Sequence, residues 1–475
     1  MIAVFLLAAV PLIVTQHDRG RGRFDQVNYH EPAVYRFAEQ FPTPDVSNYL
    51  SATTPGYHLV LAVVARYVTE SLVVLQLVGM LFTAGLLAVL TRWLTPRAGP
   101  PLAVILALVF ASSLYVFSSS VYLLPDNAAW LGVLGVLLIA LRPRFDAVTV
   151  LGGGAVLLAL VLTRQNHLWA AGPLLASSWL GPAFRGDRSP LREVGGLFEG
   201  LPARIRRTLL MGLGVLPAFV AVGLFARLWG GLTVPIYHEY MTGPNPATPA
   251  FVLAQLGVIG AFHAGFLLGP AWRLARTKPV TLGLVVLAGL LLVLAPETTY
   301  DHDAGRYSGL WNISAMTPDL MGRTNTLLLV LVPAGAVALA AWVSALGARS
   351  RWVLLAAFAG FTTAATASHF AWARYHEPFL LLFAAIASAL IVSRTRADGP
   401  QGRPGSLLGT ARIAGPIVHG LLLAAVTAQK MLTLTPVTEP LAVQETATDS
   451  SLELHRLWPE DWWRLEDAAR PSESP

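Results

Sequence analysis

The chain has no cysteine and only two lysines, Lys278 and Lys430, among its 475 residues. The absence of cysteine excludes disulfide bonds and metal sites built on thiolates. Charged residues of both signs make up only 13% of the chain, whereas 55% of it is hydrophobic. This composition is too apolar for a soluble domain of this size, so the sequence predicts a membrane protein.

Apolar runs that approach the length of a membrane-spanning helix, about 20 residues, recur along the whole chain. They predict an all-α, polytopic transmembrane protein with about 11–13 spans. A shorter apolar stretch at 57–66 is interpreted as a helix at the membrane interface. The candidate spans lie at 1–14, 71–90, 101–118, 128–141, 148–162, 168–180, 209–229, 251–272, 280–295, 326–346, 352–368, 378–392 and 413–428.

The first apolar segment, residues 1–14, lacks the basic flank of a cleavable signal peptide, so we interpret it as a retained span. We expect one transmembrane catalytic region over residues 1–430, with an outer loop at 17–56. An acidic tail that contains tryptophan follows at 431–475 and is expected outside.

Arginine is concentrated in every second loop between the candidate spans. The positive-inside rule then places these loops in the cytoplasm and the polar segment 24–58 outside. The net charge of +6 is therefore explained by membrane orientation, and no nucleic acid partner is expected. The pattern predicts a multi-pass protein of the plasma (inner) membrane. The arginine-rich loops lie at 91–100, 142–146, 181–208, 273–279, 347–351 and 394–412.

The remaining loops are rich in acids, histidines and tyrosines, which gather on the predicted outer side. Ionisable groups next to a bilayer usually mark a site or a pathway, although a loop acid can simply be solvated and an arginine can anchor to lipid. The run at 301–303 has the residue types of a metal site, but adjacent ligands do not point one way, so no metal and no cofactor are expected. The polar residues singled out are Asp25, His30, Glu31, Thr54, His58, Asp126, Arg164, Gln165, Asn166, His238, Asp301, Arg306, Arg374 and Tyr375.

Five short motifs follow one another along the polar segments: His30-x-Pro32 with Tyr35-Arg36-Phe37, the turn at 53–56, Arg164-Gln165-Asn166-x-x-Trp169, the loop at 301–307, and Arg374-Tyr375-x-x-Pro378. In this order, the motifs resemble the dolichyl-phosphate-glucose α-1,2-glucosyltransferases. More broadly, the chain resembles the GT-C superfamily of multispanning glycosyltransferases, and its composition suggests a prokaryotic relative. The family has adjacent Asp and Glu ahead of the histidine, whereas this chain has Asp25 followed by Gln26.

The resemblance implies a GT-C fold and a hexosyltransferase that moves a sugar from a polyprenyl-phosphate donor to an acceptor hydroxyl. The reaction would occur on the outer face with inversion, and the acceptor would be a glycan, a glycolipid or a protein, with membrane lipids as the surroundings. Asp25 is the expected general base, and His30 or Glu31 could replace or orient it. The expected phosphate ligands are Arg164, Arg306 and Arg374, and the expected substrate contacts are Thr54, His58, Asp126, Gln165, Asn166, His238, Asp301 and Tyr375.

Two other classes of protein compete with this interpretation. A secondary transporter also has about a dozen spans, but it predicts charges near the middle of the membrane and a repeated half. The sequence has few charges deep in its candidate spans and no internal repeat. A non-catalytic membrane scaffold would leave the polar clusters on one side unexplained.

Overall fold

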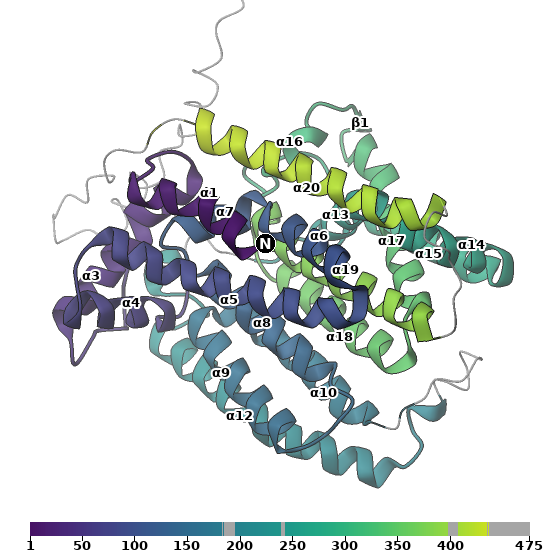
Figure 1. Ribbon diagram of the computed structural model, residues 1–475, viewed down its shortest axis with the longest axis horizontal. Coiled ribbons are helices and arrows are strands. Elements are labelled where there is room, and N and C mark those ends of the chain that lie inside the picture. The colour runs from purple at the N-terminus through teal and green to yellow at the C-terminus, as the bar shows by residue number, and fades with distance from the viewer. Residues whose placement is uncertain (183, 185–194, 239–242, 398–406, 435, 437–475) are drawn as a thin grey trace, which may run out of the picture.

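The computed structural model describes residues 1–182, 184, 195–238, 243–397, 407–434 and 436, and it is helical almost throughout (Figure 1). In the described residues, the only strands are β1 (Asp319–Leu320) and β2 (Thr324–Asn325), which pair antiparallel. The helices of the first half are α1 (Ile2–Val14), α2 (Arg21–Asp25), η1 (Gln26–His30), α3 (Glu31–Gln40), α4 (Gly56–Tyr67), α5 (Leu72–Ala98), α6 (Pro100–Ala111), α7 (Leu114–Val121), α8 (Asp126–Ala140), η2 (Val148–Gly152), α9 (Gly153–Thr163), η3 (Gln165–Ala170) and α10 (Ala171–Leu180).

The second half continues with helices that pack across the first. They are α12 (Leu201–Trp229), η4 (Pro235–Tyr237), α13 (Thr248–Phe262), α14 (Ala264–Thr277), α15 (Pro279–Leu294), α16 (Leu310–Ser314), α17 (Thr326–Ala345), α18 (Ala348–Thr366), α19 (Ala373–Ala397) and α20 (Leu407–Thr433). The predicted spans fall on helices, and those at 101–118 and 251–272 each cover two helices with a break between them. The expected tail at 431–475 lies outside the described residues except for 431–434 and 436.

Five of these helices are long and apolar enough to cross a membrane alone: α5, α12, α17, α19 and α20. Two further candidates are bent pairs, α6 with α7 at 73° and α13 with α14 at 106°. Shorter apolar helices are α1, α8, η2 with α9, and α15. The all-α, membrane-spanning class is therefore confirmed. The expectation of one span over 251–272 is wrong in its shape, because the chain turns sharply at His263.

About half of the expected outer loop at 17–56 is helical. Helix α2, the π-helix η1 and α3 follow one another without a break from Arg21 to Gln40, and an irregular stretch then leads back to α4. Apolar side chains hold this unit together. Phe37 of α3 meets Tyr49 with ring centroids 5.1 Å apart, and Trp229 at the end of α12 packs against Tyr49 from another side. This packing gives a rigid support to the residues of α2 and η1.

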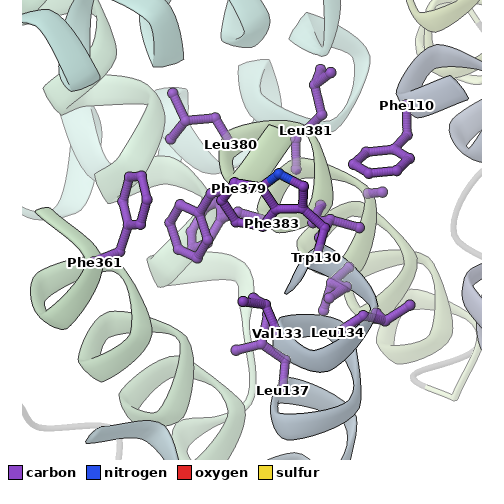
Figure 2. Packing of buried hydrophobic residues seen from close by; sticks show 14 of the residues in the cluster. Phe110, Trp130, Val133, Leu134, Leu137, Phe361, Phe379, Leu380, Leu381 and Phe383 are labelled. Carbon is purple, nitrogen blue, oxygen red and sulfur yellow. The ribbon is translucent and has the colours of Figure 1, made fainter. Parts of the chain in front are cut away.

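Helix α19 runs through the centre of the bundle, and 78% of its apolar, membrane-spanning stretch is buried inside the protein. On this helix, Phe379 packs against Phe361 of α18 and Phe383 packs against Phe358 of the same helix, while Trp130 of α8 lies on the other side (Figure 2). The ring centroids of Phe361 and Phe379 are 4.0 Å apart, in a stacked arrangement. This packing fixes the position of the first turn of α19, which carries Arg374.

The two ends of the bundle differ in chemistry. At one end, arginines donate hydrogen bonds to the last carbonyl groups of neighbouring helices, which complements the negative end of each helix dipole. Arg396 reaches Ala98 O at 3.0 Å, Arg349 reaches Ala140 O at 2.9 Å, and Arg394 reaches Leu346 O at 2.8 Å. Helices α8 and α19 run from this end to the opposite end, where α8 begins with Asp126 and α19 begins near Arg374. The described parts of the arginine-rich loops at 91–100, 347–351 and 394–412, which were predicted to share one side, therefore lie at the same end of the bundle.

Because the chain has no cysteine, single introduced cysteines can report its orientation. Asn48 is exposed in the segment after α3, and a Cβ added at Gly347 would meet no atom within 4 Å. In intact cells, an impermeant maleimide should label Asn48→Cys and should label Gly347→Cys only after permeabilisation. The reverse pattern would place Asp25 and its neighbours on the cytoplasmic side and end the proposed orientation.

Candidate active site

Asp25 is the last residue of α2, and its side chain is only 7% exposed. One turn earlier on the same helix lies Arg21, whose Nε is 3.3 Å from Asp25 Oδ1. This i,i+4 spacing places the two side chains on one face of the helix. The other carboxylate oxygen, Oδ2, accepts a hydrogen bond from Arg374, which is 349 residues further along the chain.

Arg374 joins two carboxylates. While Nη1 donates to Asp25, Nη2 donates to Oδ2 of Asp126 at 3.1 Å. Asp126 is the first residue of α8 and is also almost completely buried. A planar guanidinium can bind two oxygens in this way because its N–H groups diverge in one plane, which a lysine ammonium cannot reproduce.

Arg164 completes the cluster. It stands directly after α9, where an extended backbone (φ −151°, ψ 109°) ends the helix and turns the side chain toward α8. Its Nη1 donates to Oδ1 of Asp126, and its guanidinium lies over the ring of Tyr375, 5.5 Å from the centroid. The ion pair and the aromatic face together fix the direction of this side chain.

Every carboxylate oxygen of Asp25 and Asp126 thus has a guanidinium partner, and the four contacts involve Arg21, Arg164 and Arg374. Among the described residues, three guanidinium groups face two carboxylates, so this part of the cluster has one positive charge in excess before any histidine is considered. Buried charges are costly unless they are paired, and an unbalanced positive charge favours an incoming anion.

Two histidines lie beside the cluster. His30 Nδ1 and His58 Nε2 are 2.9 Å apart, and the rings are stacked with centroids separated by 5.2 Å. Burial, reinforced by the positive charge of Arg374, lowers the pKa of His30 to about 3. Burial and the neighbouring His30 also hold the pKa of His58 well below its usual value. Both imidazoles are therefore neutral at pH 7.

Other predicted site residues hold the backbone around the cluster. The Thr54 amide donates to Gln165 Oε1 at 2.9 Å, and Thr54 Oγ1 donates to Val161 O at 2.6 Å. Gln165 Nε2 donates to Ala52 O and to Leu232 O, both at 2.8 Å. Thr54 and Gln165 thus fasten the turn before α4 to the end of α9. Asn166, next in the chain, is exposed.

Four predicted residues take part in other contacts. Glu31 accepts a hydrogen bond from Gln26 Nε2 at 2.8 Å, and His238 Nε2 lies 2.9 Å from Thr233 O. Arg306 and Asp301 pair with each other at 3.2 Å within their own loop, where Arg306 Nε also donates to Thr299 O at 2.9 Å. None of these contacts links the four residues to Asp25 or Asp126 in the described part of the chain.

The sequence reasoning missed Arg21 as a member of the cluster. Its spacing from Asp25 was visible, but it signals an ion pair only if residues 21–25 are helical, and this stretch was interpreted as a loop. Among the described residues, no group of three or more histidine or acidic side chains is arranged to hold a metal ion.

Comparisons with known proteins add little to this geometry. No family model matches the sequence, and no curated protein matches it. Among solved structures, the chain is similar to ArnT from Cupriavidus metallidurans in the apo state, at 14% sequence identity and a TM-score of 0.36. The similarity covers 91% of this chain and 88% of that chain. At this level it carries no argument about activity.

Proposed function

We propose that the protein is a membrane glycosyltransferase of the GT-C type. It would transfer a sugar, with inversion, from a polyprenyl-phosphate donor to an acceptor hydroxyl at the outer face of the plasma (inner) membrane. The observation that carries the proposal is the position of Arg374, which is shared between Asp25 and Asp126 in a cluster whose described charges are three guanidinium groups and two carboxylates.

The phosphate of the donor is the anion that this cluster suits. Arg374 and Arg164 together offer diverging N–H groups on either side of Asp126. A polyprenyl phosphate is already a good leaving group, so it needs charge stabilisation more than it needs a proton. Guanidinium groups supply that stabilisation through bidentate contacts with the phosphate oxygens.

Asp25 would act as the general base. In the structure its two oxygens are held by Arg21 and Arg374, so both are already engaged by a guanidinium group. When the donor phosphate takes over Arg374, Oδ2 of Asp25 loses its guanidinium partner and becomes available to the acceptor hydroxyl. The acceptor hydroxyl then attacks the anomeric carbon, its proton passes to Asp25, and the bond from that carbon to the phosphate oxygen breaks with inversion.

The location of the cluster speaks against a secondary transporter. Transporter sites lie near the middle of the membrane, on interrupted helices. Here Asp126 is the first residue of α8, Arg164 follows the last residue of α9, and Arg374 lies in the first turn of α19. Charges at the ends of helices suit a reaction at the membrane surface better than a passage through it.

A binding experiment with purified protein tests the donor assignment. A polyprenyl phosphate should raise the Tm of the protein, because a ligand that binds only the folded state stabilises it. The matched polyprenol, which has the same chain without the phosphate, should raise it much less. A subsequent assay with polyprenyl-phosphate sugars should release polyprenyl phosphate. Equal stabilisation by the phosphate and the alcohol, with no sugar donor consumed, would contradict the proposal.

A further inference from the structure

The buried pair of His30 and His58 has a geometry that a purely packed pair of rings does not require. Their facing nitrogens are at hydrogen-bond distance, 2.9 Å, although the residues belong to different helices, η1 and α4. His58 is completely buried, with Tyr49 and Tyr57 against its ring. Its second nitrogen, Nδ1, is also buried and has no hydrogen-bond partner among the described residues.

This arrangement distinguishes between the two tautomers of the pair. If His30 Nδ1 were the donor, the single proton of neutral His58 would sit on Nδ1, as a buried N–H group without an acceptor. If His58 Nε2 is the donor, the proton of His58 is satisfied and only a lone pair is left unpaired. Buried N–H groups without partners are rare in folded proteins, so the second arrangement is the more stable one.

The choice fixes the chemistry of His30. Because Nδ1 of His30 then accepts from His58, its own proton must sit on Nε2. The charged groups that act on the His30 ring are Arg374, Asp126 and Arg164, the cluster itself. We infer that His58 is a positioning residue that holds His30 in the tautomer whose Nε2–H donates to an oxygen of the donor phosphate. This inference rests on the proposed function, since it takes the phosphate to bind at the cluster.

A neutral donor has a specific use at this point. The departing phosphate gains negative charge as its bond to the sugar breaks, so a fixed N–H group aimed at it strengthens in the transition state. His30 would add this donor without adding charge. A further cation there would instead compete with Arg374 and Arg164 for Asp25 and Asp126.

Nitrogen-15 NMR of histidine-labelled protein in detergent tests the tautomer directly, because protonated and bare ring nitrogens have distinct shifts. The His30 and His58 signals are assigned by their loss in the variants His30→Asn and His58→Gln. In the wild type, both rings should carry the proton on Nε2. Addition of a polyprenyl phosphate should shift the His30 Nε2 signal, whereas the matched polyprenol should not. A proton on His30 Nδ1 would overturn the inference, whatever the activity of the protein.

Turnover provides the second arm, with a matched pair of substitutions. His58→Phe keeps a flat ring but removes the donor, so His30 should become a mixture of tautomers and kcat per folded molecule should fall about tenfold, the usual effect of one hydrogen bond. His58→Gln places an amide N–H near the position of Nε2 and should keep His30 in one tautomer with most of the kcat. An unchanged kcat in His58→Phe would overturn the positioning role.

His263→Gln is the control for the loss of a buried histidine, since His263 lies at the bend between α13 and α14 with its Nδ1 2.9 Å from Ile259 O. It should leave kcat unchanged, and an equal loss there would show a general effect on folding and would count against the inference. If the phosphate produces no shift but the His30 proton is on Nε2, the phosphate assignment fails while the tautomer holds. The two failures are therefore distinguishable.

Discussion

Asp25→Asn should turn over about 10²–10⁴-fold more slowly than the wild type, because loss of a general base typically costs a rate of this size. Asparagine keeps the size of the side chain, and its single amide oxygen can still accept a hydrogen bond from Arg374 or from Arg21, but it cannot take the proton of the acceptor. Donor affinity should be unchanged or tighter, because Arg374 loses one of the two carboxylates that compete with the phosphate. The measurement is kcat and the donor KM of purified protein, each normalised to folded protein.

Glu31→Gln is the comparison that makes this result decisive. Glu31 is the other acid near the start of α3, and the resemblance to the glucosyltransferases left it as a competitor for the role of base. In the structure it accepts a hydrogen bond from Gln26 and has no contact with the cluster in the described residues. Its turnover should be near normal. A collapse in Glu31→Gln with normal turnover in Asp25→Asn would transfer the role to Glu31, and normal turnover in both would remove α2 and α3 from the chemistry.

Much of this cluster was visible in the sequence, for a physical reason. Ionisable groups next to a bilayer usually mark a site or a pathway, so Asp25, Asp126, Arg164 and Arg374 stood out as candidates without any structure. The helical class followed from the same composition. The pairing did not, because Arg374 is 349 residues from Asp25, and nothing local indicates that α19 begins beside α2.

Three features were beyond the sequence for different reasons. The bends at Ser112–Ser113 and at His263 have no proline at the break. The apolar pattern of the sequence continues across both positions, so it does not indicate a bend there. The pairing of His30 with His58 depends on how α4 packs against η1 and α3. Arg306 was assigned to the phosphate from a motif, whereas the structure pairs it with Asp301 five residues earlier, inside its own loop.

Arg374→Ala should lower kcat/KM for the donor about 10²–10³-fold, as the loss of a fixed electrostatic group in an active site does. The substitution also leaves Asp25 and Asp126 without their shared cation, which should destabilise the folded protein by ~3–5 kcal/mol. The double variant Arg374→Ala with Asp25→Asn separates these effects, because it removes the charge of one of the two carboxylates that lost Arg374. Its Tm should recover in part, while its activity should not.

Arg374→Lys is the sharper form of the same test. Lysine keeps the charge, but its ammonium cannot span Oδ2 of Asp25 and Oδ2 of Asp126 and then present two parallel N–H groups to a phosphate. We expect stability close to the wild type and a loss of donor affinity nearly as large as in Arg374→Ala. Arg306→Lys is measured in parallel, because Arg306 is the third residue assigned to the donor phosphate. Its guanidinium is held by Asp301 and by Thr299 O. If Arg374→Lys and Arg374→Ala both bind the polyprenyl phosphate normally while Arg306→Lys does not, the phosphate lies at the loop of Asp301 and the cluster has another role.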